Sequence, residues 1–181
     1  SIFFGGIAVS RTECEAAERV PRQARVHATN PRLRLDGCVQ SPLVLTPSEV
    51  GILRHEPFLG ALTCNESGGI PARSWSGVRI ADLLALVTLT PEARFVRISA
   101  GPYGYPISLA ETDQVLLCDR QEDRPLGIEH GGPWRLVVPG AGFFTSIKWV
   151  DRLEVTMERP DDSATRIALA RARVRNTKER V

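Results

Sequence analysis

The positions of apolar and polar residues along the chain predict several short strands. Three segments alternate polar and apolar residues with a period of two, which is typical of half-buried strands: 32–35, 94–99 and 152–157. Two further segments, 115–117 and 134–138, are largely apolar and rich in β-branched residues, so they are predicted as buried strands.

Short helices are predicted between these strands. Thr46 and Glu49 have the spacing of a capping box, with Pro47 at the first helical position, so a helix should begin there and run through Leu53. A second helix should begin at Ile80, since four apolar residues recur at helical spacing: Ile80, Leu83, Leu84 and Val87. Many strands with few short helices predict an α+β domain with mostly β structure in mixed or antiparallel sheets.

Regular patterning and charge suggest three parts. Residues 1–31 show no sustained periodicity and are predicted as an irregular arm, residues 32–159 as the folded domain, and residues 160–181 as a basic tail that is helical from Ser163. Residues 163–181 hold six Lys and Arg against one acid, whereas the whole chain carries only +2. The preceding 162 residues therefore carry −3, which argues against binding of nucleic acid by the body.

Composition places the chain among globular proteins of one domain. It has 181 residues, of which 43% are hydrophobic, enough to bury a substantial core. Its four cysteines are widely spaced, which argues against a zinc site or a disulfide framework. No apolar run approaches the roughly 20 residues of a membrane span. A cytoplasmic location is expected, or a periplasmic one if a leader was removed before Ser1.

Two sequence blocks contain the candidate chemistry. Cys64 ends an apolar segment and precedes a loop, where a thiolate could ligate a soft metal, although a buried structural cysteine is the alternative. In the second block Arg135 stands among apolar neighbours, where a guanidinium needs a partner. With His130, Ser146 and Lys148 beside glycine-rich backbone, it predicts a site for a phosphate group.

The order of several motifs resembles the molybdopterin-binding catalytic domain of the sulfite oxidase family. The resemblance covers about residues 32–157. The motifs are Leu35-Asp36-Gly37, Leu62-Thr63-Cys64, Trp75-Ser76-Gly77-Val78, Gly104-Tyr105, His130-Gly131-Gly132-Pro133-Trp134-Arg135 and Ser146-Ile147-Lys148-Trp149.

This resemblance implies a sulfite-oxidase-like fold and a molybdenum cofactor, Mo-molybdopterin. Cys64 would be the metal ligand. The pterin and its phosphate would be held by a set of polar residues, with two further candidates lining the pocket: His130, Arg135, Ser146 and Lys148, then Asn65 and Ser108. Tyr105 could offer a phenol near the metal, a structural tyrosine being the alternative. A separate electron-transfer protein is expected, because the chain has no room for a heme domain.

Departures from the family bear on the substrate. Sulfite oxidases follow the ligand cysteine with arginines, whereas here Asn65-Glu66-Ser67 follows, and Glu66 would repel sulfite. The leading hypothesis is therefore oxygen-atom transfer on a sulfoxide, an N-oxide or a similar small substrate. Two alternatives stay open: a cysteine-based hydrolase or transferase, and a non-catalytic module of the same fold that binds a pterin or a protein.

Overall fold

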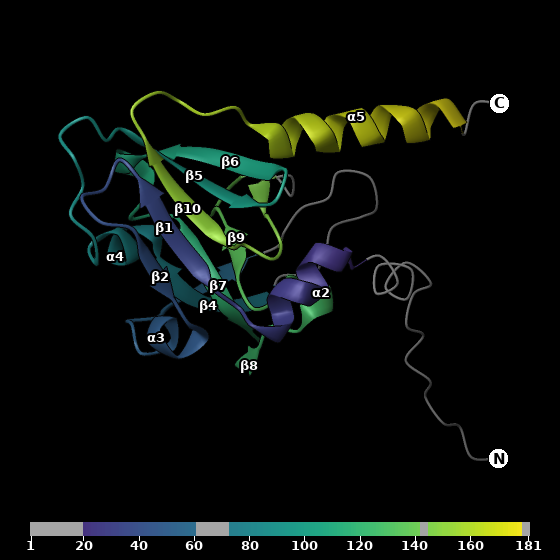
Figure 1. Cartoon of the computed structure of the whole chain (residues 1–181). Coiled ribbons are helices and arrows are strands. Elements are labelled where there is room, and N and C mark those ends of the chain that lie inside the picture. The colour runs from purple at the N-terminus through teal and green to yellow at the C-terminus, as the bar shows by residue number, and fades with distance from the viewer. Residues whose placement is uncertain (1–19, 61–72, 142–144, 179–181) are drawn as a thin grey trace, which may run out of the picture.

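The described residues form two five-stranded sheets, whose arrangement is shown in Figure 1. The computed structural model describes residues 20–60, 73–141 and 145–178, with the side chains of 171–178 left out. The first sheet has the order β2-β1-β10-β5-β6. Its strands are β1 (Leu33–Gly37), β2 (Leu43–Leu45), β5 (Phe95–Ala100), β6 (Tyr103–Ser108) and β10 (Arg152–Thr156).

The second sheet has the order β3-β4-β7-β8, with β9 also paired to β7. Its strands are β3 (Glu56–Gly60), β4 (Arg73–Arg79), β7 (Leu116–Gln121), β8 (Arg124–Pro125) and β9 (Arg135–Val137). All of its pairings are antiparallel, whereas β1 and β10 of the first sheet are parallel. The predicted α+β class with mixed, mostly β sheets is thereby confirmed.

Alternation along the strands separates two apolar clusters. The larger cluster joins both sheets, with Leu35 and Ile98 from the first and Leu117 and Leu136 from the second. Neighbouring residues of the second sheet point to its opposite face and form a smaller cluster there: Trp75, Leu116, Cys118, Leu126 and Val137, with Phe58 packed against them. The second sheet is therefore apolar on both faces.

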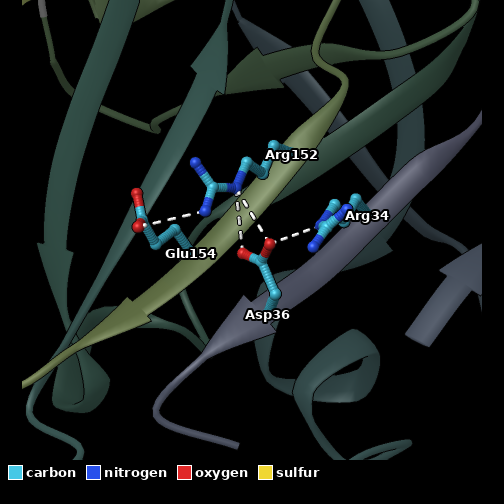
Figure 2. Close-up of polar contacts among 4 residues, drawn as sticks. All are labelled: Arg34, Asp36, Arg152 and Glu154. Carbon is cyan, nitrogen blue, oxygen red and sulfur yellow. Dashed lines mark hydrogen bonds and ion pairs between the residues drawn. The ribbon is translucent and has the colours of Figure 1, made fainter. Parts of the chain in front are cut away.

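On its polar face, the first sheet carries an ion-pair network (Figure 2). The carboxylate of Asp36 accepts hydrogen bonds from Arg34 on the same strand and from Nε of Arg152 on β10, the latter at 2.9 Å. Arg152 also donates to Glu154 at 3.1 Å. Asp36 is only 4% exposed, since both guanidinium groups cover it. The network joins β1 to β10 beside their backbone ladder.

Helix α3 (Pro47–Gly51) begins where the capping box predicts. The Thr46 hydroxyl accepts from the Glu49 N–H at 3.3 Å, and the Glu49 carboxylate accepts from the Thr46 N–H at 2.7 Å. The helix from Ile80, α4 (Ile80–Leu84), ends earlier than the periodicity predicts. Its last turn is closed by tighter bonds, from Leu86 N–H to Leu83 O and from Val87 N–H to Leu84 O.

The prediction of an irregular arm is wrong for residues 22–29, which form α2 (Arg22–Thr29). Only Ala24 of this helix is buried, so its sequence shows little apolar periodicity. The helix contacts η2 (Ile128–His130), a short 3-10 helix more than a hundred residues later. Such tertiary contacts stabilise a short helix that propensity alone would not.

The basic segment contains α5 (Ser163–Lys178), as its sequence predicts. Helix α5 extends along and beyond β6 in Figure 1. Ser163, at its first position, accepts a hydrogen bond from Gly104 N–H at 3.0 Å and donates to Pro102 O at 2.8 Å. These two bonds occupy backbone groups at an edge strand of the first sheet. Among the described residues no helix is long and apolar enough to cross a membrane.

Candidate functional site

Strand β9 places a cation on the second sheet. It pairs with β7 so that Arg135 lies opposite Cys118 and Leu136 opposite Leu117. Because side chains alternate along a strand, Leu136 enters the larger cluster while Arg135 and Val137 face the smaller one. Arg135 is only 5% exposed. A guanidinium this deeply buried needs polar partners, as the sequence predicts.

The guanidinium of Arg135 donates hydrogen bonds to other residues of the second sequence block. Its Nε donates to Ser146 Oγ at 2.9 Å and one terminal nitrogen donates to His130 O at 3.1 Å. Ser146 Oγ in turn donates to Leu136 O at 2.9 Å. The guanidinium carbon lies 5.3 Å from the centroid of the Trp75 ring, in cation–π contact.

Lys148 lies close to the same group. Its Nζ donates to Glu129 O at 2.8 Å and lies 5.6 Å from the centre of the Trp149 ring. The Trp149 indole N–H donates to Ile128 O at 2.6 Å. Residues 148–149 are thus anchored by side chains onto the carbonyl groups of η2.

Backbone hydrogen bonds bring the two halves of the block together. Leu136 N–H donates to Ile147 O at 2.8 Å, and Val150 N–H donates to Trp134 O at 2.9 Å. Gly131 has φ +105°, and a Cβ there would lie 2.8 Å from Lys148 Cγ. A glycine is therefore required for the lysine chain to pack over this turn.

Burial lowers the affinity of both cations for their protons. It reduces the pKa of Arg135 to about 10. It also reduces the pKa of Lys148 to about 8, with the positive charge of Arg135 adding to the effect. Desolvated cations that repel each other gain from a bound anion, which would restore both charges. The arrangement of Arg135, Ser146 and Lys148, which we call the cation cluster, is chemically suited to a phosphate group.

His130 joins this cluster through its backbone. Its carbonyl accepts from Arg135, whereas its imidazole side chain is half-exposed, with Nε2 at 3.6 Å from Glu129 Oε1. The four predicted residues of the second block are therefore brought together: His130, Arg135, Ser146 and Lys148.

Tyr105 and Ser108 lie on β6 of the first sheet, with other neighbours. Tyr105 packs against the larger cluster, and its pKa is raised by burial and then by the charges of Asp162 and Glu111. Ser108 forms a capping box with Glu111 at η1 (Leu109–Glu111). Within the described residues, neither side chain forms a hydrogen bond or ion pair with the cation cluster. Their catalytic or binding roles stay predictions.

Cys64 and Asn65 lie outside the described residues. Gly60 and Arg73, the described residues on either side, are cross-strand partners in β3 and β4. Among the described residues, no group of three or more His, Cys, Asp or Glu side chains could hold a metal. The roles of Cys64 and Asn65 therefore stay predictions.

Two residues near the cluster were not predicted as site residues. Trp75 Nε1 and His27 Nε2 are buried and have no hydrogen-bond partner in the described structure. The His27 ring lies 5.9 Å from that of Trp134, the residue before Arg135. The sequence does not reveal that the Nε2 atom of His27 is buried without a hydrogen-bond partner, because this histidine stands alone in a segment without periodicity. Trp75 does stand in the Trp-Ser-Gly-Val motif, but the motif does not distinguish packing from ligand binding.

The chain is similar in sequence and fold to several known proteins. A family model for the oxidoreductase molybdopterin binding domain matches residues 18–164. The mitochondrial sulfite oxidase of Drosophila melanogaster is 31% identical over 107 residues, covering 52% of this chain and 19% of that protein. The NADH nitrate reductase of Volvox carteri is 30% identical over 160 residues, covering 69% and 18%.

The solved structure of the sulfane dehydrogenase SoxCD from Paracoccus pantotrophus is similar in fold. The TM-score is 0.63 at 27% sequence identity, covering 71% of this chain and 38% of that chain. The chain spans about a fifth of the length of the two curated relatives. It belongs to the family of oxidoreductase molybdopterin-binding domains.

Proposed function

We propose that the chain is the cofactor-binding catalytic part of a molybdenum oxidoreductase that transfers an oxygen atom to or from a small substrate. Mo-molybdopterin would supply the redox chemistry, while the protein binds and orients it. This proposal goes beyond family membership, since the relatives are much longer proteins.

The cation cluster is the observation that carries the proposal. Arg135 is almost fully buried, and its guanidinium donates hydrogen bonds to Ser146 Oγ and His130 O. Burial also lowers the pKa of Lys148 beside it. An anionic phosphate bound here would offset the cost of burying both charges and would accept charge-assisted hydrogen bonds. The residues present therefore fit the phosphate-bearing end of a molybdopterin.

Each residue of the site has a distinct role in this proposal. Arg135 and Lys148 bind the phosphate, and Ser146 holds the guanidinium in place. His130 lines the rim of the site with a half-exposed imidazole. Cys64 supplies a thiolate to the metal, a role that rests on the sequence alone.

The sequence favours a sulfoxide, an N-oxide or a similar neutral substrate. Glu66 follows Cys64 closely and would repel an oxyanion such as sulfite. Electrons would be exchanged with a separate electron-transfer protein. The names of the relatives point to sulfite, nitrate and sulfane chemistry in those proteins, so the substrate must be determined directly.

Production in a host that makes molybdenum cofactor tests this function. The purified chain should contain close to one molybdenum atom per chain, and Cys64→Ser should abolish turnover. Activity should be screened on sulfoxides, N-oxides and sulfite with a reduced or oxidised dye as electron carrier. A loaded wild-type protein that turns over none of these substrates would favour a non-catalytic module instead.

A further inference from the structure

Trp75 is placed to touch the cation cluster from another strand. It lies on β4, whereas Arg135 lies on β9, and β7 runs between the two strands. On β7, Cys118 is the cross-strand neighbour of both Gly77 and Arg135. Because Gly77 and Cys118 are small, the long side chains of Trp75 and Arg135 can meet on this face. The guanidinium carbon of Arg135 lies 5.3 Å from the centroid of the Trp75 ring.

The space at this contact is tightly restricted. A Cβ on Gly77 would lie 2.3 Å from Leu117 O and 2.5 Å from Cys118 Cα. Trp75 is 2% exposed and packs in the smaller cluster with Phe58 as its cross-strand neighbour on β3. The indole is therefore fixed in position before any ligand binds. Its ring is in cation–π contact with the Arg135 guanidinium.

The indole N–H of Trp75 is the unexplained group. It is buried without a hydrogen-bond partner in the described structure. An unpaired buried donor destabilises the folded state, and a fold seldom keeps one unless a ligand or water satisfies it. The other indole of the site behaves differently, since the Trp149 N–H already donates to Ile128 O.

We propose that Trp75 is a further cofactor-binding residue, whose indole N–H donates a hydrogen bond to an oxygen or nitrogen acceptor of bound molybdopterin while its ring holds the Arg135 guanidinium. The inference rests on the proposed function, because molybdopterin is the ligand it assumes. In the cofactor-free chain this N–H has no hydrogen-bond partner, which destabilises the folded state. Cofactor binding would supply the missing acceptor.

Two substitutions separate the donor from the ring. Trp75→Phe removes the N–H but keeps an aromatic ring near Arg135, whereas Trp75→Leu removes both. In cofactor-free protein Trp75→Phe leaves a cavity but removes an unpaired donor and breaks no hydrogen bond, so it should lower the melting temperature less than Trp149→Phe does. Trp149→Phe is the matched control, and it should lower the melting temperature because a bond to Ile128 O is lost.

The rate of cofactor loss measures the ligand contact. Loaded protein is diluted, and the pterin that remains bound is quantified over time. Trp75→Phe should lose pterin about tenfold faster than wild type, the effect of losing one hydrogen bond to the ligand. Trp75→Leu should lose it faster still. Equal loss from wild type and Trp75→Phe would overturn the inference while leaving the proposed function intact.

A measurement on wild-type protein does not depend on the variants folding. The indole ¹H–¹⁵N signal of Trp75, assigned by its absence from the spectrum of Trp75→Phe, should move downfield on cofactor loading. An unchanged Trp75 signal in loaded protein would overturn the inference. Wild-type protein that contains no pterin at all would overturn both the inference and the proposed function.

Discussion

Arg135 and Lys148 repel each other inside the protein. Burial is the larger reason that the pKa of Lys148 falls to about 8, and the charge of Arg135 is the next. The lysine ammonium donates to the carbonyl of Glu129, a neutral acceptor that only partly compensates the lost hydration. In the cofactor-free protein this pair is destabilising, and it becomes favourable only when an anion is bound.

The first prediction concerns pH and stability. Lys148 has a pKa of about 8 in the folded chain and 10.5 as the ordinary value, so between these pH values the unfolded chain binds more protons. The free energy of unfolding of cofactor-free wild type should therefore rise with pH in this window. Between pH 8 and 10.5 the free energy of unfolding of wild type should rise by about 2 kcal/mol more than that of Lys148→Met, after allowance for the partial exposure of Lys148. Parallel pH profiles from denaturant titrations would contradict this account.

A second prediction concerns anion binding to the cofactor-free protein. Inorganic phosphate should raise the melting temperature, because binding to the folded state stabilises it. The increment should be lost in Arg135→Met and should shrink above pH 8, where Lys148 loses its proton. Arg120→Met, which removes an exposed arginine of the neighbouring strand, should keep the full increment. An equal increment in Arg135→Met would show that phosphate acts only as a general stabilising salt.

The sequence predicts the elements whose cause is local. Alternation predicts β1, β5 and β10, and capping-box spacing predicts the start of α3. Strands β3, β4 and β6 were not predicted, because proline, glycine and arginine interrupt their apolar pattern. Helix α2 was also missed, since its support comes from η2.

The site shows the same division. That Arg135 and Lys148 lie close together was predictable, because a cation among apolar neighbours is unusual and both stand near glycine-rich backbone. Trp75 was not, because its missing hydrogen bond is a property of the packed structure. Alternation along β6 also does not reveal that Tyr105 has Asp162 and Glu111 as its charged neighbours.

A third prediction concerns the ion-pair network of Figure 2. Burial acts to raise the pKa of Asp36, but hydrogen bonds from Arg152 and Arg34 outweigh it, so the pKa lies below its ordinary value. Asp36→Asn should therefore lower the free energy of unfolding at pH 7 by about 2 kcal/mol. The difference from wild type should disappear as the pH falls through the native pKa of Asp36.

Glu154→Gln is the matched control for this network. In the described part of the chain Glu154 pairs with Arg152, and it is more exposed than Asp36, so its substitution should cost less than about 1 kcal/mol. Urea titrations of both variants measure the two costs. A larger effect at Glu154 than at Asp36 would show that the network is not centred on the buried carboxylate.

A fourth prediction concerns the contact between α5 and β6. Ser163→Ala removes the acceptor of the buried Gly104 N–H and the donor to Pro102 O. It should cost about 1–2 kcal/mol of stability, and the Gly104 amide should exchange with solvent much faster. Thr165→Ala tests a nearby position of the same helix, whose side chain is only partly buried. Unchanged exchange at Gly104 in Ser163→Ala would mean that the serine does not hold the edge strand.

The cofactor content of Arg135→Met tests the central claim most directly. Wild type, Arg135→Met and Arg120→Met are produced side by side in a cofactor-producing host, and molybdenum and pterin are quantified per chain. Methionine matches the apolar surroundings of Arg135, so the variant should fold at least as stably as cofactor-free wild type. The account predicts near-stoichiometric cofactor in wild type and Arg120→Met and at least tenfold less in Arg135→Met. A folded Arg135→Met protein with the wild-type content of cofactor would contradict it.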